Sequence, residues 1–319
     1  MTRREPALAP PGFLRNKVVW TLLMVLFLFP FFIHIPRSLN HHPIISPLGD
    51  QVHIFLFGAI ALLLYWFGPM QGRIWRAAML SAFMGGAVEF LQLLVGRQAL
   101  FTDFLLDLLG IGIVVGFVSW KGHGSRLAKW VFLLLVLTLP AQLYHMPWRI
   151  AATYHCRGIF PVIADFETYS DRFLWGNNME GQLSFPRIED SPDGDGHVLR
   201  LSGDSESNWP GALMRRFPED WSEYSVLKLD VRMVEVPGDS VRFGIRIDDY
   251  EGIKELAWIS KSFYATRQWQ TFSIPLVDRK LANSDRILNL AEMDRLIIYF
   301  GKPQEMRTIE IDNLRLEKD

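Results

Sequence analysis

Five polar side chains flank a predicted turn between two apolar segments: Glu89, Gln92, Arg97, Asp103 and Asp107. Glu89 lies three residues before Gln92, so the two side chains share one face of a helix. Asp103 and Asp107 are four residues apart and share a face in the same way. Two antiparallel helices joined by a turn place both pairs at the same level, with Arg97 between them.

Carboxylates cost free energy in an apolar environment, which limits what this cluster can be. Within the hydrocarbon of a membrane a carboxylate costs several kcal/mol, and less where it reaches water or a partner. Two interpretations fit. In the first, one ion pair fastens a hairpin of two helices. In the second, the cluster is a polar site that opens on one side of a membrane.

The composition separates the chain into two unlike halves. The chain has 319 residues, half of them hydrophobic, and a mean hydropathy of +0.13. Apolar runs follow one another up to about Tyr144, whereas charged and turn residues occur throughout from about Asp165. This length fits two domains. The net charge of −1 gives no indication of a nucleic-acid partner. A single cysteine, Cys156, excludes an intrachain disulfide and a multi-thiolate metal site.

The N-terminal half predicts a membrane domain at residues 18–145, preceded by a polar, Pro-rich cytoplasmic tail at 1–17. A helix needs about 17–25 apolar residues to cross a bilayer. The first apolar run is not followed by the small residues of a signal-peptide cleavage site, so it is expected to remain as a span. The five predicted spans are residues 18–35, 52–67, 74–95, 104–120 and 127–143.

Basic residues predict the orientation, because cytoplasmic loops are enriched in Lys and Arg. With the N-terminus inside, nine basic residues lie on the cytoplasmic side and only Arg37 and Arg97 lie opposite. Five spans then place the C-terminal half outside the cytoplasm. The predicted location is the inner membrane, which the chain crosses several times. The nine residues are Arg3, Arg4, Arg15, Lys17, Arg73, Arg76, Lys121, Arg126 and Lys129.

The same topology brings a third helix end to the outer leaflet. Asp50 and His53 stand three residues apart at the start of the second span. Three helix ends therefore deliver polar residues to one side of the membrane. The predicted polar membrane site consists of Asp50, His53, Glu89, Gln92, Arg97, Asp103 and Asp107.

This pattern resembles the VanZ-like family, which is named for an accessory protein of glycopeptide antibiotic resistance. The resemblance rests on Asp-x-x-His, Glu-x-x-Gln, an Arg in the turn and Asp-x-x-x-Asp-x-x-Gly, and it covers roughly Asp50 to Trp120. It implies that the seven residues are the family's polar positions. Asp107 stands where the family pattern has Asn, and Gln51 stands where Lys is common. Both differences make the site more acidic, and the family's activity is too poorly defined to supply a mechanism.

From Asp165 the hydrophobic period changes from 3.6 to 2, which is typical of strands. Apolar and polar residues alternate one by one in two long runs, and six similar runs accompany them. The runs are residues 197–201, 212–217, 227–233, 241–248, 258–265, 270–276, 296–300 and 308–316. Eight or so short strands between Gly, Pro, Asp and Asn clusters predict an antiparallel β-sandwich at 165–319. Residues 146–164 are the predicted connector, and residues 281–294 are predicted to hold a short helix.

The outer half resembles the carbohydrate-binding, galactose-binding-like jelly rolls. The residues that carry the resemblance are DFE at 165–167, DWSEY at 220–224, WQTFSIPL at 269–276 and IDNLRL at 311–316. The resemblance implies a structural calcium between the first and last strands. Its oxygen donors would be Glu167 and Asp312, since Ca²⁺ prefers carboxylate and carbonyl ligands. The alternative is two surface carboxylates near the ends of the domain.

Sugar binding requires aromatic platforms beside hydrogen-bonding groups on an open face. Trp221, Tyr224 and Trp269 stand in apolar strand contexts and are predicted to be core. Arg246 and Asp248 project from the polar face of one strand and could pair around a ligand, although a solvated face explains them as well. The predicted glycan-binding residues are Arg246, Asp248, Trp175, Trp209, Tyr250, Trp258 and Tyr264. No spacing of carboxylates marks a glycoside hydrolase.

The leading hypothesis is a non-enzymatic envelope protein in contact with membrane lipids. It would recognise a glycan, glycolipid or cell-wall precursor through the sandwich and the helix-end site. The rival is an enzyme in which His53, Glu89 and the aspartates act as acid and base, or hold Mg²⁺, Mn²⁺ or Zn²⁺, on a lipid-linked substrate. In a third hypothesis the polar cluster only locks the helices together.

Overall fold

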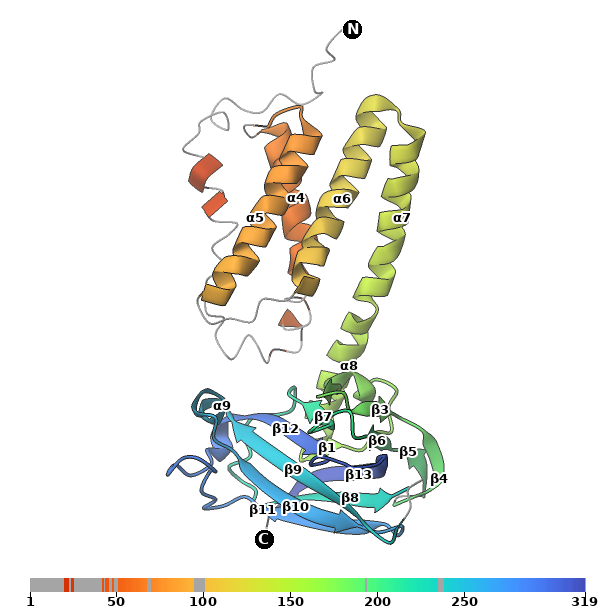
Figure 1. Cartoon of the computed structure of the whole chain (residues 1–319), viewed down its shortest axis with the longest axis vertical. Coiled ribbons are helices and arrows are strands. Elements are labelled where there is room, and N and C mark those ends of the chain that lie inside the picture. Colours follow the sequence, from red (N-terminus) through yellow and green to blue (C-terminus); the bar gives the residue numbers. More distant parts are fainter. Residues whose placement is uncertain are drawn as a thin grey trace. The chain divides into compact units, whose positions relative to one another are not determined.

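A computed structural model describes residues 20–22, 24–25, 42, 44–45, 48, 51–67, 70–94, 101–192, 194–234 and 238–318. The chain divides into two compact units, Met1–Met146 and Pro147–Asp319. The described helices of the first unit are α4 (Val52–Trp66), α5 (Ile74–Leu94), α6 (Phe101–His123) and α7 (Arg126–Leu143) (Figure 1). They coincide with four of the predicted spans. Most of the fifth, residues 18–35, lies outside the described residues; 20–22 and 24–25 are helical.

The first unit has an apolar interior where α4, α5 and α6 meet. Its buried residues are Phe57, Ile60, Ala61, Leu64, Ile74, Ala77, Ala78, Val88, Ile111, Val115 and Val118. Helix α7 begins at Ser125, whose hydroxyl accepts the backbone N–H of Ala128 at 3.2 Å. No residue of α7 is buried, although the helix is apolar.

Large apolar side chains therefore cover the outside of these helices. Leu127, Trp130, Leu134 and Leu137 of α7 are each exposed by more than 60%. A soluble protein rarely exposes a contiguous surface of this kind. Within the part of the chain that the structure describes, three segments are long and apolar enough to cross a membrane: Ile74–Leu91, Thr102–His123 and Arg126–Ile159. Helix α4 is apolar but shorter.

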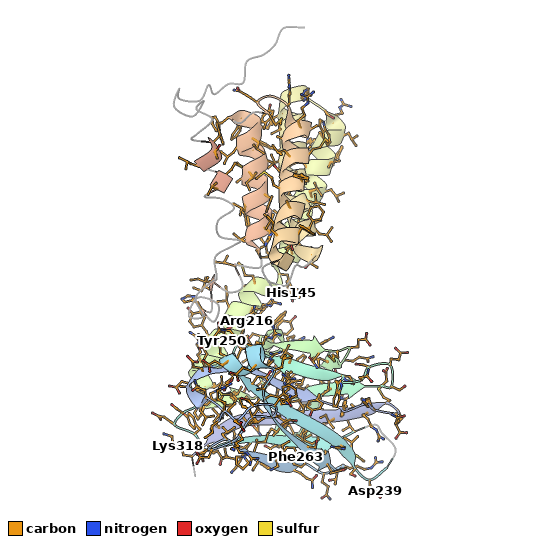
Figure 2. All side chains as sticks on the ribbon, turned by 60° about the vertical axis from the view of Figure 1, so that its left-hand side comes forward. His145, Arg216, Asp239, Tyr250, Phe263 and Lys318 are labelled. Carbon is orange, nitrogen blue, oxygen red and sulfur yellow. The ribbon has the colours of Figure 1, made fainter. Side chains whose placement is uncertain are left out.

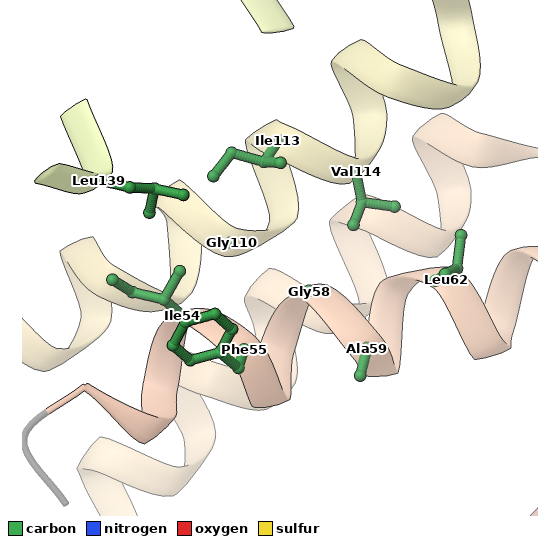
Figure 3. Close-up of a pocket in the computed structure, with 9 residues that line it drawn as sticks. All are labelled: Ile54, Phe55, Gly58, Ala59, Leu62, Gly110, Ile113, Val114 and Leu139. Atoms are coloured by element: carbon green, nitrogen blue, oxygen red, sulfur yellow. The ribbon is translucent and has the colours of Figure 1, made fainter. Parts of the chain in front are cut away.

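Glycine allows α4 and α6 to cross closely. A Cβ atom at Gly110 of α6 would overlap the backbone carbonyl of Ile54 in α4. On the α4 side, a Cβ at Gly58 would lie 3.2 Å from the Gly110 oxygen. Such small residues let helix backbones approach each other in membrane proteins. The crossing leaves an apolar groove of about 210 Å³ (Figure 3). Its lining residues are Ile54, Phe55, Gly58, Ala59, Leu62, Gly110, Ile113, Val114 and Leu139.

Substitution of Gly110 by alanine is expected to destabilise the helical unit. The added methyl group must push α6 away from the α4 backbone, and overpacking typically costs about 1–3 kcal/mol. Gly122→Ala in the same helix is the matched control, because a Cβ there meets nothing within 4 Å. That change is expected to be neutral or stabilising, since alanine favours helix over glycine. Thermal unfolding of the full-length protein in detergent measures both, and equal melting temperatures would contradict the close crossing.

The second unit is an antiparallel β-sandwich preceded by helix α8 (His145–Ile159), which lies largely in the predicted connector. In one sheet the strand order is β11-β8-β13-β6-β3, and β1 pairs with β13. In the other sheet the strand order is β10-β9-β12-β7-β2. Strands β4 and β5 form a separate hairpin. The strands of the first sheet are β1 (Val162–Ala164), β3 (Gln182–Ser184), β6 (Leu199–Gly203), β8 (Val226–Met233), β11 (Gln270–Pro275) and β13 (Arg307–Glu317). Those of the second are β2 (Trp175–Asn178), β7 (Gly211–Met214), β9 (Val241–Asp249), β10 (Ile259–Ala265) and β12 (Met293–Tyr299). The hairpin pairs β4 (Arg187–Ser191) with β5 (Gly194–His197).

All eight predicted strands are present, because each buries one alternating set of side chains between the sheets. The predicted short helix at 281–294 is wrong. That segment holds only a 3₁₀ turn, η3 (Leu290–Glu292), and its backbone otherwise makes bridges and turns.

The core of the sandwich joins the two sheets through aromatic rings. The ring centroids of Phe263 and Phe272 are 5.0 Å apart, and those of Phe243 and Phe272 are 5.2 Å apart. Phe263 is labelled in Figure 2. Trp221 is buried, as predicted. The prediction that Trp269 is core is wrong: it is half-buried at the surface, and its indole N–H donates to the carbonyl of Asp190.

Candidate functional site

Three helices of the first unit bring polar side chains together at the start of α4, the end of α5 and the start of α6. His53 of α4 lies between two carboxylates of α6: its Nδ1 is 2.9 Å from Asp107 Oδ1, and its Nε2 is 3.9 Å from Asp103 Oδ2. His53 is 8% exposed and Asp107 is 1% exposed. These groups are therefore held by each other rather than by solvent.

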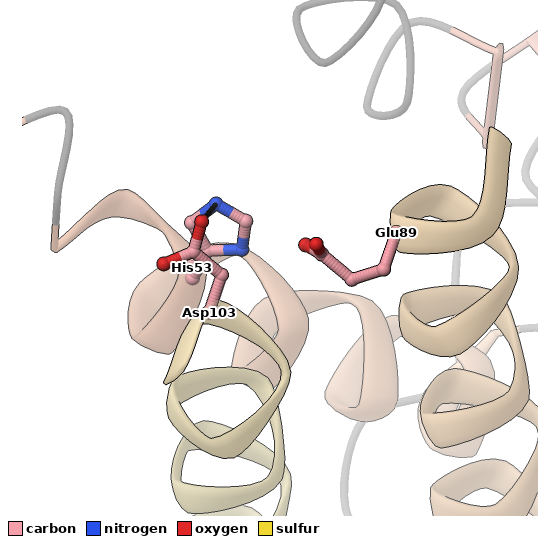
Figure 4. Close-up of side chains that lie close together, drawn as sticks. All are labelled: His53, Glu89 and Asp103. Carbon is pink, nitrogen blue, oxygen red and sulfur yellow. Dashed lines mark ion pairs between the residues drawn. The ribbon is translucent and has the colours of Figure 1, made fainter. Parts of the chain in front are cut away.

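Glu89 of α5 completes the cluster. Figure 4 shows its carboxylate pointing toward His53 and Asp103. One ligand atom from each of the three residues lies within 4.8 Å of the others. An imidazole with two carboxylates can bind a divalent cation such as Zn²⁺ or Mn²⁺, or act in general acid–base chemistry.

The structure describes only part of the predicted polar membrane site. It brings His53, Glu89, Asp103 and Asp107 together. Asp50 and Arg97 lie outside the described residues, as does the side chain of Gln92, whose backbone continues α5. The places of these three in the site remain predictions.

In the sandwich, the outer face of the β10-β9-β12-β7-β2 sheet carries a fixed charge network. Arg246 donates to both oxygens of Asp248, two residues further along β9, at 2.8 and 3.0 Å. Arg295 of β12 forms a second ion pair with Asp248, at 2.7 Å. The Arg246 guanidinium lies 3.9 Å from the centroid of the Trp258 ring. The alternating pattern thus placed Arg246 and Asp248 on one face, and Asp248 is buried beneath its arginines.

Beside this network, two aromatic rings form a platform. Tyr299 of β12 lies across Gly244 of β9, where a Cβ would be only 2.5 Å from the ring carbon Cζ. The Tyr299 hydroxyl reaches Ser260 of β10 at 2.8 Å. Trp209 packs edge-to-face on Tyr299, with ring centroids 5.6 Å apart, and is 41% exposed. Tyr264, further along β10, is also exposed. We call Trp209, Tyr299, Trp258 and Arg246 the aromatic face.

Trp175 and Tyr250 are predicted glycan-binding residues that lie outside the aromatic face. Trp175 is only 7% exposed and belongs to the sandwich core, because β2 turns this ring inward against Phe166. It therefore presents no ring to a ligand. Tyr250 begins helix α9 (Tyr250–Glu255), and its ring lies 4.5 Å from the Lys254 ammonium group.

Sequence reasoning missed Tyr299, Arg295 and Ser260. The signal for Tyr299 was present, because strand alternation around Leu296 and Ile298 directs it to the outer face. Arg295 had no such signal, since its pairing with Asp248 depends on the register of β12 against β9.

A polar groove of about 560 Å³ lies on the opposite sheet. Its lining residues are Pro192, Asp230, Trp269, Gln270, Thr271, Asn313 and Arg315. Asp230 is already engaged there, since it accepts from Thr271 at 2.5 Å and pairs with Arg315 at 3.2 Å.

The calcium prediction rests on two carboxylates in different environments. Asp312 of β13 is buried and accepts the backbone N–H of Asn313 at 2.8 Å. Glu167 is exposed and lies against Gly196. Calcium at these residues remains a prediction.

Comparisons with known proteins give distant structural likenesses. No family model and no curated protein matches the chain, so the VanZ-like resemblance also remains a prediction. An exo-beta-agarase structure is 17% identical with a TM-score of 0.42, over 50% of this chain and 25% of the agarase. A family 11 carbohydrate-binding module from Clostridium thermocellum, solved with a beta-1,3-1,4-mixed-linked tetrasaccharide, is 19% identical with a TM-score of 0.37, over 49% of this chain and 94% of the module. A family 30 carbohydrate-binding module of a cellulosomal cellulase from the same organism is 19% identical with a TM-score of 0.35, over 46% and 92%. Likenesses of this size transfer no ligand.

Proposed function

We propose that this chain is a multi-pass envelope protein whose β-sandwich binds a glycan on the aromatic face. The observation that carries the proposal is the pairing of an exposed aromatic platform with a rigid set of hydrogen-bonding groups. Trp209 and Tyr299 offer flat apolar surface on which a sugar ring can pack, and Arg246 offers N–H donors beside it. Binding sites for small polar ligands combine these two elements.

Rigidity favours this face over an ordinary solvated surface. Asp248 forms ion pairs with Arg246 and Arg295, and the Ser260 hydroxyl forms a hydrogen bond with the Tyr299 hydroxyl. The side chains therefore lose little conformational entropy when a ligand binds, which lowers the cost of association. Long charged side chains on a solvated face would lose much more.

The membrane part of the proposal rests on the helices of the first unit. Their exposed surface is apolar, and charge is divided between their two ends. Arg73 and Arg76 lie at the start of α5, and Lys121 and Arg126 lie where α6 meets α7. Glu89 and Asp103 lie at the other ends of α5 and α6 and form the helix-end cluster with His53. By the positive-inside rule the basic ends face the cytoplasm, so the sandwich that follows α7 belongs outside it.

Two measurements on the full-length protein test the proposal. A glycan array probed with detergent-solubilised protein is expected to show selective binding to polysaccharides, and the absence of any binding would overturn the glycan proposal. A C-terminal reporter fusion is expected to be active only outside the cytoplasm. Activity in the cytosol alone would overturn the topology and leave the glycan result standing.

A second candidate function is supported by the helix-end cluster. The convergence of His53, Glu89 and Asp103 within 4.8 Å fits a membrane enzyme that uses a divalent cation or acid–base chemistry on a lipid-linked substrate. Glu89→Gln is expected to remove bound metal or envelope activity while the protein still folds. If this variant instead only lowers the melting temperature, the cluster is a structural lock between helices.

A further inference from the structure

A second group of His and Asp side chains lies close together within the C-terminal unit. His155 is on helix α8, Asp165 directly follows β1, and Asp171 is the first residue of the 3₁₀ helix η2 (Asp171–Leu174). Three segments separated by up to sixteen residues of chain therefore meet at one point. One ligand atom from each residue lies within 4.8 Å of the others.

The distances match those between ligands that share an ion. His155 Nε2 is 3.5 Å from Asp165 Oδ1 and 3.9 Å from Asp171 Oδ2. These distances are too long for good hydrogen bonds. Two ligands of a tetrahedral zinc ion, each about 2.1 Å from the metal, lie about 3.4 Å apart. A small inward movement of the side chains would therefore bring all three ligand atoms to a metal ion.

The imidazole nitrogen provides an independent observation. His155 Nε2 is buried and has no hydrogen-bond partner among the described residues. A buried polar atom without a partner is costly and needs an explanation. Here the nitrogen faces the two carboxylates, so a cation between the three groups would satisfy it.

Asp171 is held in place for this role. Its Oδ1 accepts the Thr168 hydroxyl at 2.6 Å and its Oδ2 accepts the Thr168 backbone N–H at 3.1 Å. Partners of this kind orient metal ligands in proteins. Asp165 Oδ1 accepts the backbone N–H of Glu167 at 3.3 Å, which fixes the second carboxylate.

We propose that His155, Asp165 and Asp171 bind a divalent transition-metal ion, with Zn²⁺ as the best fit. One imidazole and two carboxylates suit Zn²⁺ or Mn²⁺, whereas Ca²⁺ and Mg²⁺ prefer oxygen ligands alone. Three protein ligands leave a fourth position for water. The ion would fasten α8 to the first strand of the sandwich, whose core already contains Ala152 and Cys156 of the same helix.

Zinc titration of the full-length protein, stripped with a chelator, tests the site. Wild-type protein is expected to bind Zn²⁺ at this site, and His155→Ala and Asp165→Asn are each expected to weaken binding at least tenfold. His145→Ala, on the same helix and exposed, is the matched control and is expected to bind as the wild type does. Because Glu89→Gln is expected to remove metal from the helix-end cluster, the titration is repeated in this background, where the remaining zinc binding is expected to depend on His155 and Asp165.

Folding of the variants is checked by hydrogen exchange of the sandwich strands. Asp165→Asn keeps the shape of the side chain, so its loss of zinc binding is expected with protection unchanged. Absence of zinc binding in the wild type, or equal affinity in the wild type and both ligand variants, would overturn the proposal. Neither result bears on glycan binding.

Discussion

Replacement of Asp249 by alanine is expected to destabilise the sandwich by about 3–5 kcal/mol, because it removes the buried partner of Arg286 and the acceptor of two backbone N–H groups. Asp249 is fully buried and receives two hydrogen bonds from Arg286, at 2.6 and 2.7 Å. Its oxygens also accept the backbone N–H groups of Gly252 and Asn289, at 2.7 and 2.8 Å. One carboxylate thus starts helix α9 and fastens the segment around Arg286 to β9.

The measurement is hydrogen exchange of β9 and β12 amides in the full-length protein, since local opening reports this region without melting the helical unit. A loss of 3 kcal/mol corresponds to exchange that is faster by about a hundredfold or more. Asp285→Ala is the matched control: it removes an exposed carboxylate next to Arg286 and is expected to change little. Equal protection in both variants would show that the network adds no stability.

The pH dependence of the wild type gives the same test without a substitution. Burial raises the pKa of Asp249, but the hydrogen bonds from Arg286 and the backbone outweigh it, so the pKa lies below its ordinary value of 3.8. A carboxyl group with a lowered pKa in the folded state stabilises the fold above its unfolded pKa of about 4. That contribution is lost as the pH falls through the lower folded value. Protection of β9 is therefore expected to drop below about pH 4, and to drop less in Asp249→Asn.

The sequence predicted those helices and strands that follow from the local pattern of apolar and polar residues. Long apolar runs predicted α4 to α7, and alternating apolar residues predicted the eight strands from β6 to β13. Strands β1 to β5 were missed because sequences such as WGNN and GDGH show no alternation of apolar and polar residues. Trp269 was assigned to the core on its apolar strand context, whereas its ring stacks under Arg232 at 4.8 Å and lines a groove.

The candidate sites could be predicted from the sequence only in part. Helical period and the antiparallel order of the helices predicted that His53, Glu89 and Asp103 approach one another, because these positions lie at the same level of neighbouring helices. The partner of Asp248 could not be predicted, since Arg295 reaches it only through the pairing of β12 with β9. His155 was missed for a similar reason, because its neighbours Asp165 and Asp171 come from segments without regular periodicity.

Loss of glycan binding is the largest functional effect expected, and Trp209→Ala is the variant expected to cause it. Exposed aromatic anchors at the centre of a binding face typically contribute about 2 kcal/mol or more, which is about a thirtyfold loss of affinity. Trp209 lies at the surface, so its removal leaves the core intact. The measurement is isothermal titration of the full-length protein with a polysaccharide identified on the array.

Gly244→Val tests the platform without removing an aromatic ring. The added side chain must displace Tyr299 from the face, because even a Cβ would lie 2.5 Å from its ring. Binding is expected to fall about as far as in Trp209→Ala. Trp269→Ala is the control on the opposite sheet and is expected to bind normally. If Trp269→Ala abolishes binding and the other two variants do not, the glycan binds in the groove beside Asp230 and Arg315, and the proposed aromatic face is wrong.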